Sequence, residues 1–226
     1  ALVADPKLSI DALNAQATVA KYSHERSAAE AIWRQALAAA RAIGDRLNEQ
    51  TMLYNLAVLA GDQGNLHGQA EHGRQALAIC NELRLESCSV ELSTMLGGVL
   101  LYTGPIDEAH ELLTSAFEYH RQHGQRSREG EAIAFLAEWA QKRDDLAASG
   151  GFARQWLALM RENGEPRLID WARANVFWVE LDGGADIDPD GELAAVARRA
   201  AEQKDTDLEG MARAMRGLAA LRRGRL

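Results

Sequence analysis

Arg34-Gln35-Ala36-Leu37 returns 40 residues later as Arg74-Gln75-Ala76-Leu77, and this recurrence decides the fold of the chain. A further copy is Arg154-Gln155-Trp156-Leu157, and Thr114-Ser115-Ala116-Phe117 fills the slot between the second and third copies. Self-similarity with a period of about 20 to 50 residues is the sequence signature of a repeat architecture. The spacing therefore predicts an elongated array of repeated units, and such arrays mostly present surfaces for binding.

A second column of residues keeps the same spacing and marks a turn in each unit. Glycine is its commonest residue, as expected where a helix ends and the backbone changes direction. The column consists of His24, Gly64, Gly104, Asp144, Gly184 and Gly224. In this register six units begin near residues 10, 50, 90, 130, 170 and 210 of a single array that spans residues 1–226.

Each unit has the pattern of a helix, a short turn and a second helix. In unit two, Leu53, Leu56, Ala57 and Ala60 have helical spacing and predict a first helix over residues 48–61. The second helices are expected over residues 27–43, 66–83, 106–120 and 146–161. One first-helix column stays small, which lets the paired helices approach closely. Its members are Ala17, Ala57, Gly97, Ala137 and Gly217, and Phe177 interrupts it in unit five.

The composition limits the compartments and partners of the chain. Its 226 residues carry a net charge of −8, which argues against direct binding to a nucleic-acid backbone. No apolar run is long enough for a membrane span, and no signal-peptide pattern is present. Cys80 and Cys88 lack metal-type spacing, so we expect small apolar residues at a unit junction in a reduced, cytoplasmic protein. The start without Met and the stop inside a repeat suggest a fragment of a longer protein.

These features resemble the tetratricopeptide repeat (TPR) family. The family pattern has a small residue in the first helix, a glycine at the turn and an alanine early in the second helix, here Ala29 and Ala109. The segment Gly104-Pro105-Ile106-Asp107-Glu108-Ala109 is close to the usual turn of the family. The period of 40 and the stretch Arg41–Arg46 resemble the variant found in large bacterial regulators, such as maltose-activator-type and related signalling proteins. The resemblance implies an all-α fold, a right-handed superhelix of about five and a half helix pairs.

The resemblance further implies that the first helices line a concave wall on which partners bind. The Lys/Asn set with which many family members grip a C-terminal carboxylate is absent, so a chaperone-tail clamp is rejected. Beside Thr51 and Glu91, the expected wall residues are Asn14, Tyr22, Tyr54, Val58, Asp62, Thr94, Tyr102, Glu138, Lys142, Trp171 and Trp178. Trp171 and Trp178 lie two helical turns apart and could either seat apolar side chains of a partner or pack against the neighbouring unit.

Three further segments have a functional and a structural interpretation. The first acidic positions of a calcium-binding loop are matched by Asp186, Asp188 and Asp190. Position 197, where the closing glutamate of such a loop would lie, is alanine. We therefore expect Asp188 to cap a helix that begins at Pro189, with no metal or cofactor. His120 and His123 are expected to be solvated surface residues. Five arginines near the end are expected to face solvent or a further repeat: Arg213, Arg216, Arg222, Arg223 and Arg225.

The sequence predicts a non-catalytic scaffold or sensor segment of a larger cytoplasmic bacterial signalling or transcriptional regulator. No phosphate-binding loop and no evident nucleophile–base set supports an enzyme. Its partner is expected to be a protein or peptide, other domains of the parent chain included, with a small inducer as a further possibility and neither nucleic acid nor membrane. The alternative is a self-association module in which the surface of units five and six forms a homodimer.

Overall fold

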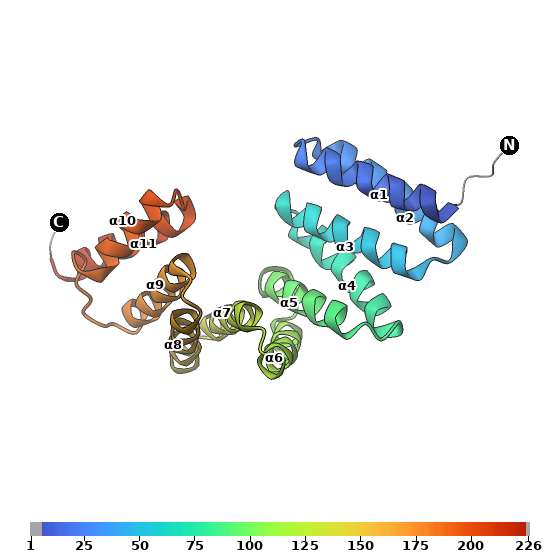
Figure 1. The fold of residues 1–226 in the computed structure, drawn as a ribbon. Coiled ribbons are helices and arrows are strands. Elements are labelled where there is room, and N and C mark those ends of the chain that lie inside the picture. Colours follow the sequence, from blue (N-terminus) through green and yellow to red (C-terminus); the bar gives the residue numbers. More distant parts are fainter. Residues whose placement is uncertain (1–5, 225–226) are drawn as a thin grey trace. The chain divides into compact units, whose positions relative to one another are not determined.

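A computed structural model describes residues 6–224, which contain eleven helices and no strand (Figure 1). The fold is therefore all-α, with five helix pairs and the first helix of a sixth, as the repeat predicts. The helices are α1 (Pro6–Tyr22), α2 (Arg26–Ile43), α3 (Arg46–Asp62), α4 (Leu66–Glu82), α5 (Glu86–Thr103), α6 (Ile106–Gln122), α7 (Arg126–Lys142), α8 (Leu146–Asn163), α9 (Pro166–Asp182), α10 (Glu192–Glu202) and α11 (Thr206–Arg222).

The turns follow a half-period of 20 residues. From position 24 to position 224, each twentieth residue has a left-handed backbone, with Gly104 as the exception. These residues are His24, Gly44, Gly64, Arg84, Gly124, Asp144, Gly164, Gly184, Lys204 and Gly224. Gly104 is extended instead, with φ −144° and ψ −162°, because the residue before a proline is driven toward extended backbone by the ring of Pro105. Turn geometry thus fixes the length of nearly every helix.

Side-chain caps open α3, α4, α8 and α11. The carboxylate or amide oxygens of Asp45, Asn65, Asp145 and Asp205 each accept a hydrogen bond from the backbone N–H three residues later. Such a cap satisfies an amide that has no partner within the helix and contributes about 1 kcal/mol. The residue after the left-handed position therefore sets where the next helix begins.

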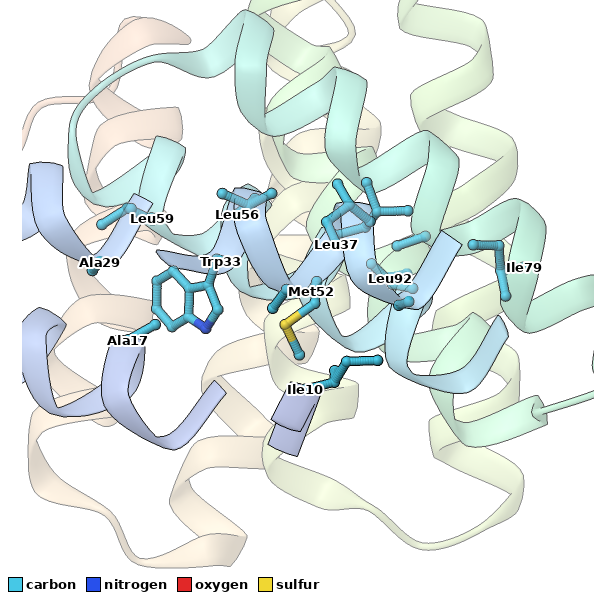
Figure 2. Packing of buried hydrophobic residues seen from close by; sticks show 14 of the residues in the cluster. Ile10, Ala17, Ala29, Trp33, Leu37, Met52, Leu56, Leu59, Ile79 and Leu92 are labelled. Atoms are coloured by element: carbon cyan, nitrogen blue, oxygen red, sulfur yellow. The ribbon is translucent and has the colours of Figure 1, made fainter. Parts of the chain in front are cut away.

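The chain divides into two compact parts, Ala1–Ser115 and Ala116–Leu226, and the division lies within α6. That residues 1–226 form a single array stays a prediction. In the N-terminal part, α1 packs against α2, α2 against α3, α3 against α4 and α4 against α5. Its core surrounds Trp33, whose indole lies close to Ala17 and Ala29, with Met52 and Leu92 in the same cluster (Figure 2).

The C-terminal part repeats this helix pairing with two apolar clusters. In the first, Trp156 and Met160 of α8 pack with Ile133 of α7 and Ala172 of α9. In the second, α9, α10 and α11 come together around Leu193, among other residues. Both clusters contact the half-buried Trp171, so this residue bridges the two.

The small-residue column behaves as expected where its helix pair is complete. A side chain at Gly97 would meet Leu113 at 2.6 Å, so only glycine allows α5 and α6 to approach this closely. In unit five Phe177 packs with the α10 cluster, and α10 has 11 residues where the other second helices have 17 or 18. A loop occupies the stretch that would complete the helix, as the divergent sequence predicts.

Candidate partner-binding surface

The first helices of the N-terminal part form a hollow between α3 and α5. Its lining residues are Gln50, Thr51 and Tyr54 of α3 and Cys88 and Glu91 of α5, and it encloses about 230 Å³. Small-molecule sites commonly measure ~300–1,000 Å³, so this hollow has room for one amino-acid side chain rather than for a whole ligand. Its position on the first helices matches the face on which the resemblance places the partner.

One hydrogen bond spans the hollow and sets its chemistry. The Tyr54 hydroxyl donates to Oε1 of Glu91 at 2.8 Å, and both side chains are half-buried. The carboxylate of Glu91 is thus a hydrogen-bond acceptor on one side of the hollow. The tyrosine ring supplies apolar contact area beside this acceptor. The hollow is therefore suited to a side chain with an apolar stem and a donor at its end, such as lysine or arginine.

A disulfide lies at the edge of the hollow. Cys80 of α4 and Cys88 of α5 are joined, with an S–S distance of 2.01 Å and the Cα atoms 5.9 Å apart. The expected position at a helix junction is confirmed, but the expectation of reduced thiols is wrong for this structure. The cysteines are eight positions apart in the sequence, and the turn between α4 and α5 brings them together, a proximity that spacing rules for metal sites do not detect.

Several other expected wall residues in this part are engaged within the protein. Oδ1 of Asn14 accepts hydrogen bonds from Trp33 Nε1 and from Asn55 Nδ2, both at 2.9 Å. Asp62 pairs with Lys21 at 2.9 Å. Thr94 is buried, and its hydroxyl donates to the Val90 carbonyl one turn earlier. Asn14 therefore connects α1 to α2 and α3, whereas the Thr94 hydrogen bond stays within α5.

The remaining wall residues differ in how far they reach into solvent. Tyr22 and Tyr102 are 79% and 60% exposed, whereas Val58 is half-buried. In the C-terminal part, Lys142 pairs with Glu138 one helical turn earlier at 3.8 Å. The two tyrosines thus present aromatic surface, and the α7 pair presents charge.

The two tryptophans of α9 separate into a packed residue and an exposed one. Trp171 is half-buried, contacts both C-terminal clusters, and donates from Nε1 to Oδ2 of Asp205 at 2.9 Å. Arg167 donates from Nε to the same oxygen at 2.7 Å. Trp178 is 41% exposed. The geometry gives Trp171 a packing role, and it leaves Trp178 as the aromatic that a partner could reach.

The environment of Asp205 perturbs its ionisation. Burial acts to raise the pKa of Asp205, but hydrogen bonds from Arg167, Trp171 and the Leu208 amide together hold the pKa below that of an ordinary aspartate. The carboxylate therefore stays ionised at neutral pH. It caps α11 and connects that helix to α9.

The acidic loop between α9 and α10 is bound by arginines of α11 and the turn after it. Arg223 pairs with Asp186 and lies 3.4 Å from Asp188, and Arg216 donates to Oδ1 of Asp190 at 3.2 Å and to the Pro189 carbonyl at 2.9 Å. The acids that resemble a calcium loop thus have guanidinium partners. Within residues 6–224, no group of three or more His, Cys, Asp or Glu side chains could hold a metal ion.

Three smaller expectations need correction. Asp188 does not cap α10, which begins at Glu192 after Gly191; its Oδ1 instead accepts from the Asp190 amide at 3.3 Å within the loop. His120 is buried and its Nδ1 lies 2.7 Å from the Gln125 side-chain oxygen, so it is no solvated surface residue. The terminal arginines do not simply face solvent, since Arg216 and Arg223 hold the acidic loop; Arg225 lies outside the described residues.

The sequence did not identify Gln50 and Cys88 as part of the hollow, although it placed Thr51, Tyr54 and Glu91 on the wall. The available signal was the helical spacing of positions 50, 51 and 54 on one face, together with the offset of 37 residues between Tyr54 and Glu91. This offset differs from the period, because a residue of one first helix meets the next first helix slightly before its own equivalent.

None of the described helices is long and apolar enough to cross a membrane.

Comparison with known proteins finds a similar regulatory protein and solved structures that share the fold. No protein-family profile matches its sequence. It is 30% identical over 166 residues to the regulatory protein AfsR of Streptomyces griseus, a match that covers 74% of this chain and 16% of AfsR. The chain thus spans about a sixth of the length of this curated relative.

Solved structures share the fold at low sequence identity. RapI in its apo form matches with a TM-score of 0.73 and 11% identity over 96% of this chain and 60% of its own. A Rap protein in complex with Competence and Sporulation Factor matches with a TM-score of 0.66 and 16% identity over 87% and 55%. A putative kinesin light chain with TPR-like repeats from Podosopora anserina gives 0.66 and 14% over 94% and 97%. The fold is that of TPR-like helical repeat proteins.

Proposed function

We propose that this chain is a protein- or peptide-binding segment of a larger bacterial regulator, and that the partner binds the first helices around the hollow of Gln50, Thr51, Tyr54, Cys88 and Glu91. The hollow carries the proposal, because it combines an aromatic wall with a carboxylate acceptor on the helices that are expected to face a partner. The sequence similarity to AfsR and the fold shared with a Rap protein in complex with its factor support it.

The partner's anchor follows from the chemistry of the hollow. A lysine or arginine side chain would lay its alkyl stem along the Tyr54 ring and donate to Glu91, which is a charge-assisted hydrogen bond. Tyr102 and Tyr22 would then offer apolar contacts further along the first helices. Binding free energy gained in this way can bias the arrangement of attached domains of a parent chain. In this proposal the segment is cytoplasmic and performs no catalysis itself.

A cytoplasmic location has a consequence for the disulfide. Reducing systems keep most cytosolic cysteines as thiols, so Cys80 and Cys88 would be bonded there only after oxidation. Since Cys88 lines the hollow, bond formation and partner binding would involve the same surface. Binding measurements should therefore be made on both the oxidised and the reduced chain.

A random peptide library displayed on phage tests the proposal without a known partner. We expect the chain to enrich sequences with a fixed lysine or arginine. Tyr54→Ala should weaken these peptides at least tenfold, because it removes an aromatic anchor. Glu91→Gln should weaken them about threefold to tenfold and reduce the dependence on salt. Glu71→Gln on the exposed surface of α4 is the matched control. Enriched peptides that bind both hollow variants like the wild type would refute the assignment.

Self-association is the second candidate function. Among the described residues of units five and six, the large exposed apolar side chains are Trp178 of α9 and Leu218 and Leu221 of α11. A second copy could cover them. Sedimentation at increasing concentration tests this idea: a dimer that Trp178→Arg or Leu221→Glu dissociates would support it, and a monomer throughout would exclude it.

A further inference from the structure

The outer face of α1 carries an apolar stripe with no partner in the described structure. Five side chains follow one another at alternating intervals of four and three residues, which is the spacing of a helix–helix contact seam. This α1 seam consists of Leu8, Ala12, Ala15, Val19 and Tyr22, and all five are exposed. Leu8 and Val19 are 67% and 65% exposed, an unusual state for residues of this kind at seam positions.

The 40-residue register shows that two positions of this stripe are covered in every other unit. The positions equivalent to Ala12 are all completely buried, and they are Met52, Leu92, Ala132, Ala172 and Ala212. The positions equivalent to Val19 are buried or half-buried, and they are Leu59, Val99, Trp139, Val179 and Ala219. At the positions of Ala12 and Val19, α1 is therefore the one exposed case among the six first helices of residues 6–224, whereas the positions equivalent to Tyr22 are exposed in every unit.

The covering element is the second helix of the preceding unit. Helix α2 packs against α3, α4 against α5, α8 against α9 and α10 against α11. A side chain at Gly73 of α4 would meet Met95 of α5 at 3.3 Å, and one at Gly150 of α8 would meet Val179 of α9 at 3.4 Å. Small residues of the second helix thus face the seam of the following first helix.

Helix α9 is the closest counterpart of α1 in this respect. Pro6 and Pro166 both open their helices, Lys7 and Arg167 follow, and Leu8 and Leu168 come next. The seam then continues with the pairs Ala12 and Ala172, and Val19 and Val179. Since α8 covers α9, the helix that fits the α1 seam should have the pattern of α8: a glycine opposite Val19 and large apolar side chains near Leu8.

We propose that the α1 seam is a docking site for an amphipathic helix of the α8 type, supplied from outside residues 6–224 and running antiparallel to α1. The residues that flank the seam are Ser9, Asp11, Gln16, Thr18 and Ser23, so apolar contact rather than charge drives the docking. A second copy of α1 is a poorer occupant, because its own seam has no glycine to face Val19. The proposal does not depend on a partner in the hollow, although Tyr22 belongs both to the α1 seam and to the expected wall.

Two matched measurements test the docking. In the first, a peptide of residues 146–163 is titrated into the intact chain while hydrogen exchange of α1 is followed. In the second, residues 146–165 are fused before Pro6 in place of residues 1–5, which reproduces the junction between α8 and α9. Tethering raises the effective concentration to about the millimolar range, so weak docking becomes visible.

We expect amides of α1 to exchange at least tenfold more slowly in the fusion than in the intact chain. Val19→Asp should abolish this protection while leaving the unfused chain unchanged, because Val19 is exposed there. The corresponding substitution of the exposed Gln16 by Asp is the control and should preserve the protection. The proposal is overturned if neither peptide nor fusion protects α1, if protection survives Val19→Asp, or if the intact chain forms a dimer that Val19→Asp dissociates.

Discussion

In the N-terminal part a tryptophan indole donates to an amide oxygen, and in the C-terminal part another tryptophan donates to a carboxylate. Asn14 accepts from Trp33 and Asn55, and Asp205 accepts from Trp171 and Arg167 at the same oxygen. Both acceptors tie together neighbouring repeat units with two hydrogen bonds. The amide needs no counter-charge, whereas the buried carboxylate needs a cation. The stability contributed by these two hydrogen-bonded acceptors should therefore respond differently to substitution and to pH.

The largest difference should come from deleting the charged acceptor. Asp205→Ala removes the cap of α11 and leaves the Trp171 indole without an acceptor, and we expect a loss of about 2–3 kcal/mol. The exposed Arg167 adds little to this loss because water screens its charge. Asp45→Ala, at the equivalent register position, removes a cap and a hydrogen bond from the Asn48 side chain, and should cost about 1 kcal/mol. Urea unfolding of both variants measures the contrast, and equal losses would show that the Asp205 network adds nothing.

Deleting the neutral acceptor should have a smaller effect. Asn14→Ala leaves two donors, Trp33 Nε1 and Asn55 Nδ2, without their acceptor, for an expected loss of about 1–2 kcal/mol. Gln16→Ala on the exposed side of the same helix should change the free energy of unfolding by less than about 0.5 kcal/mol. The two variants are compared by urea unfolding at neutral pH. A loss for Asn14→Ala no larger than that for Gln16→Ala would contradict the bridging role.

The pH dependence should distinguish the two bridges further. The lowered pKa of Asp205 contributes stability above the unfolded-state value of about 3.9, and this contribution is lost as the pH falls through the folded-state pKa. Asp205→Asn should therefore reduce the acid destabilisation that is seen below about pH 4. Asn14→Ala should leave that acid limb unchanged in slope. Thermal unfolding between pH 7 and pH 2 checks both statements, and parallel curves for wild type and Asp205→Asn would refute the first.

The smallest effect is expected at the acidic loop. Its pairs with Arg216 and Arg223 lie largely at the surface, so Arg223→Ala should lower the free energy of unfolding only slightly, and the effect should shrink in high salt. Hydrogen exchange of residues 185–191 is the more sensitive readout and should accelerate. Unchanged exchange would mean that the loop holds its conformation without this arginine.

Most of the fold could be predicted from the sequence, because glycines at a regular spacing mark most of its turns. Helix α4 begins at Leu66 as expected and ends within one residue of the expected boundary. Arg84 and Lys204 adopt the same left-handed backbone as the glycines, and composition gives no sign of this. Only their position in the 20-residue register shows it.

The candidate surface could be predicted only in outline. Helical periodicity placed Tyr54 and Glu91 on one wall, but their hydrogen bond depends on the offset between neighbouring helices. The roles of Trp171 and Asp205 depend on contacts between residues 34 positions apart, which a single sequence does not reveal. The disulfide likewise depends on where one turn places two side chains.

The regular succession of left-handed turns has a consequence for how such a chain can gain or lose length. Deleting residues 45–84 would join Gly44 directly to Leu85, so that one turn residue takes the place of another and each later helix keeps its phase. A deletion of one or two residues would instead assign the left-handed conformation to a residue of a helix, at a cost of roughly 1–2 kcal/mol for a side chain other than glycine. Insertions and deletions should therefore be inherited as whole helix pairs.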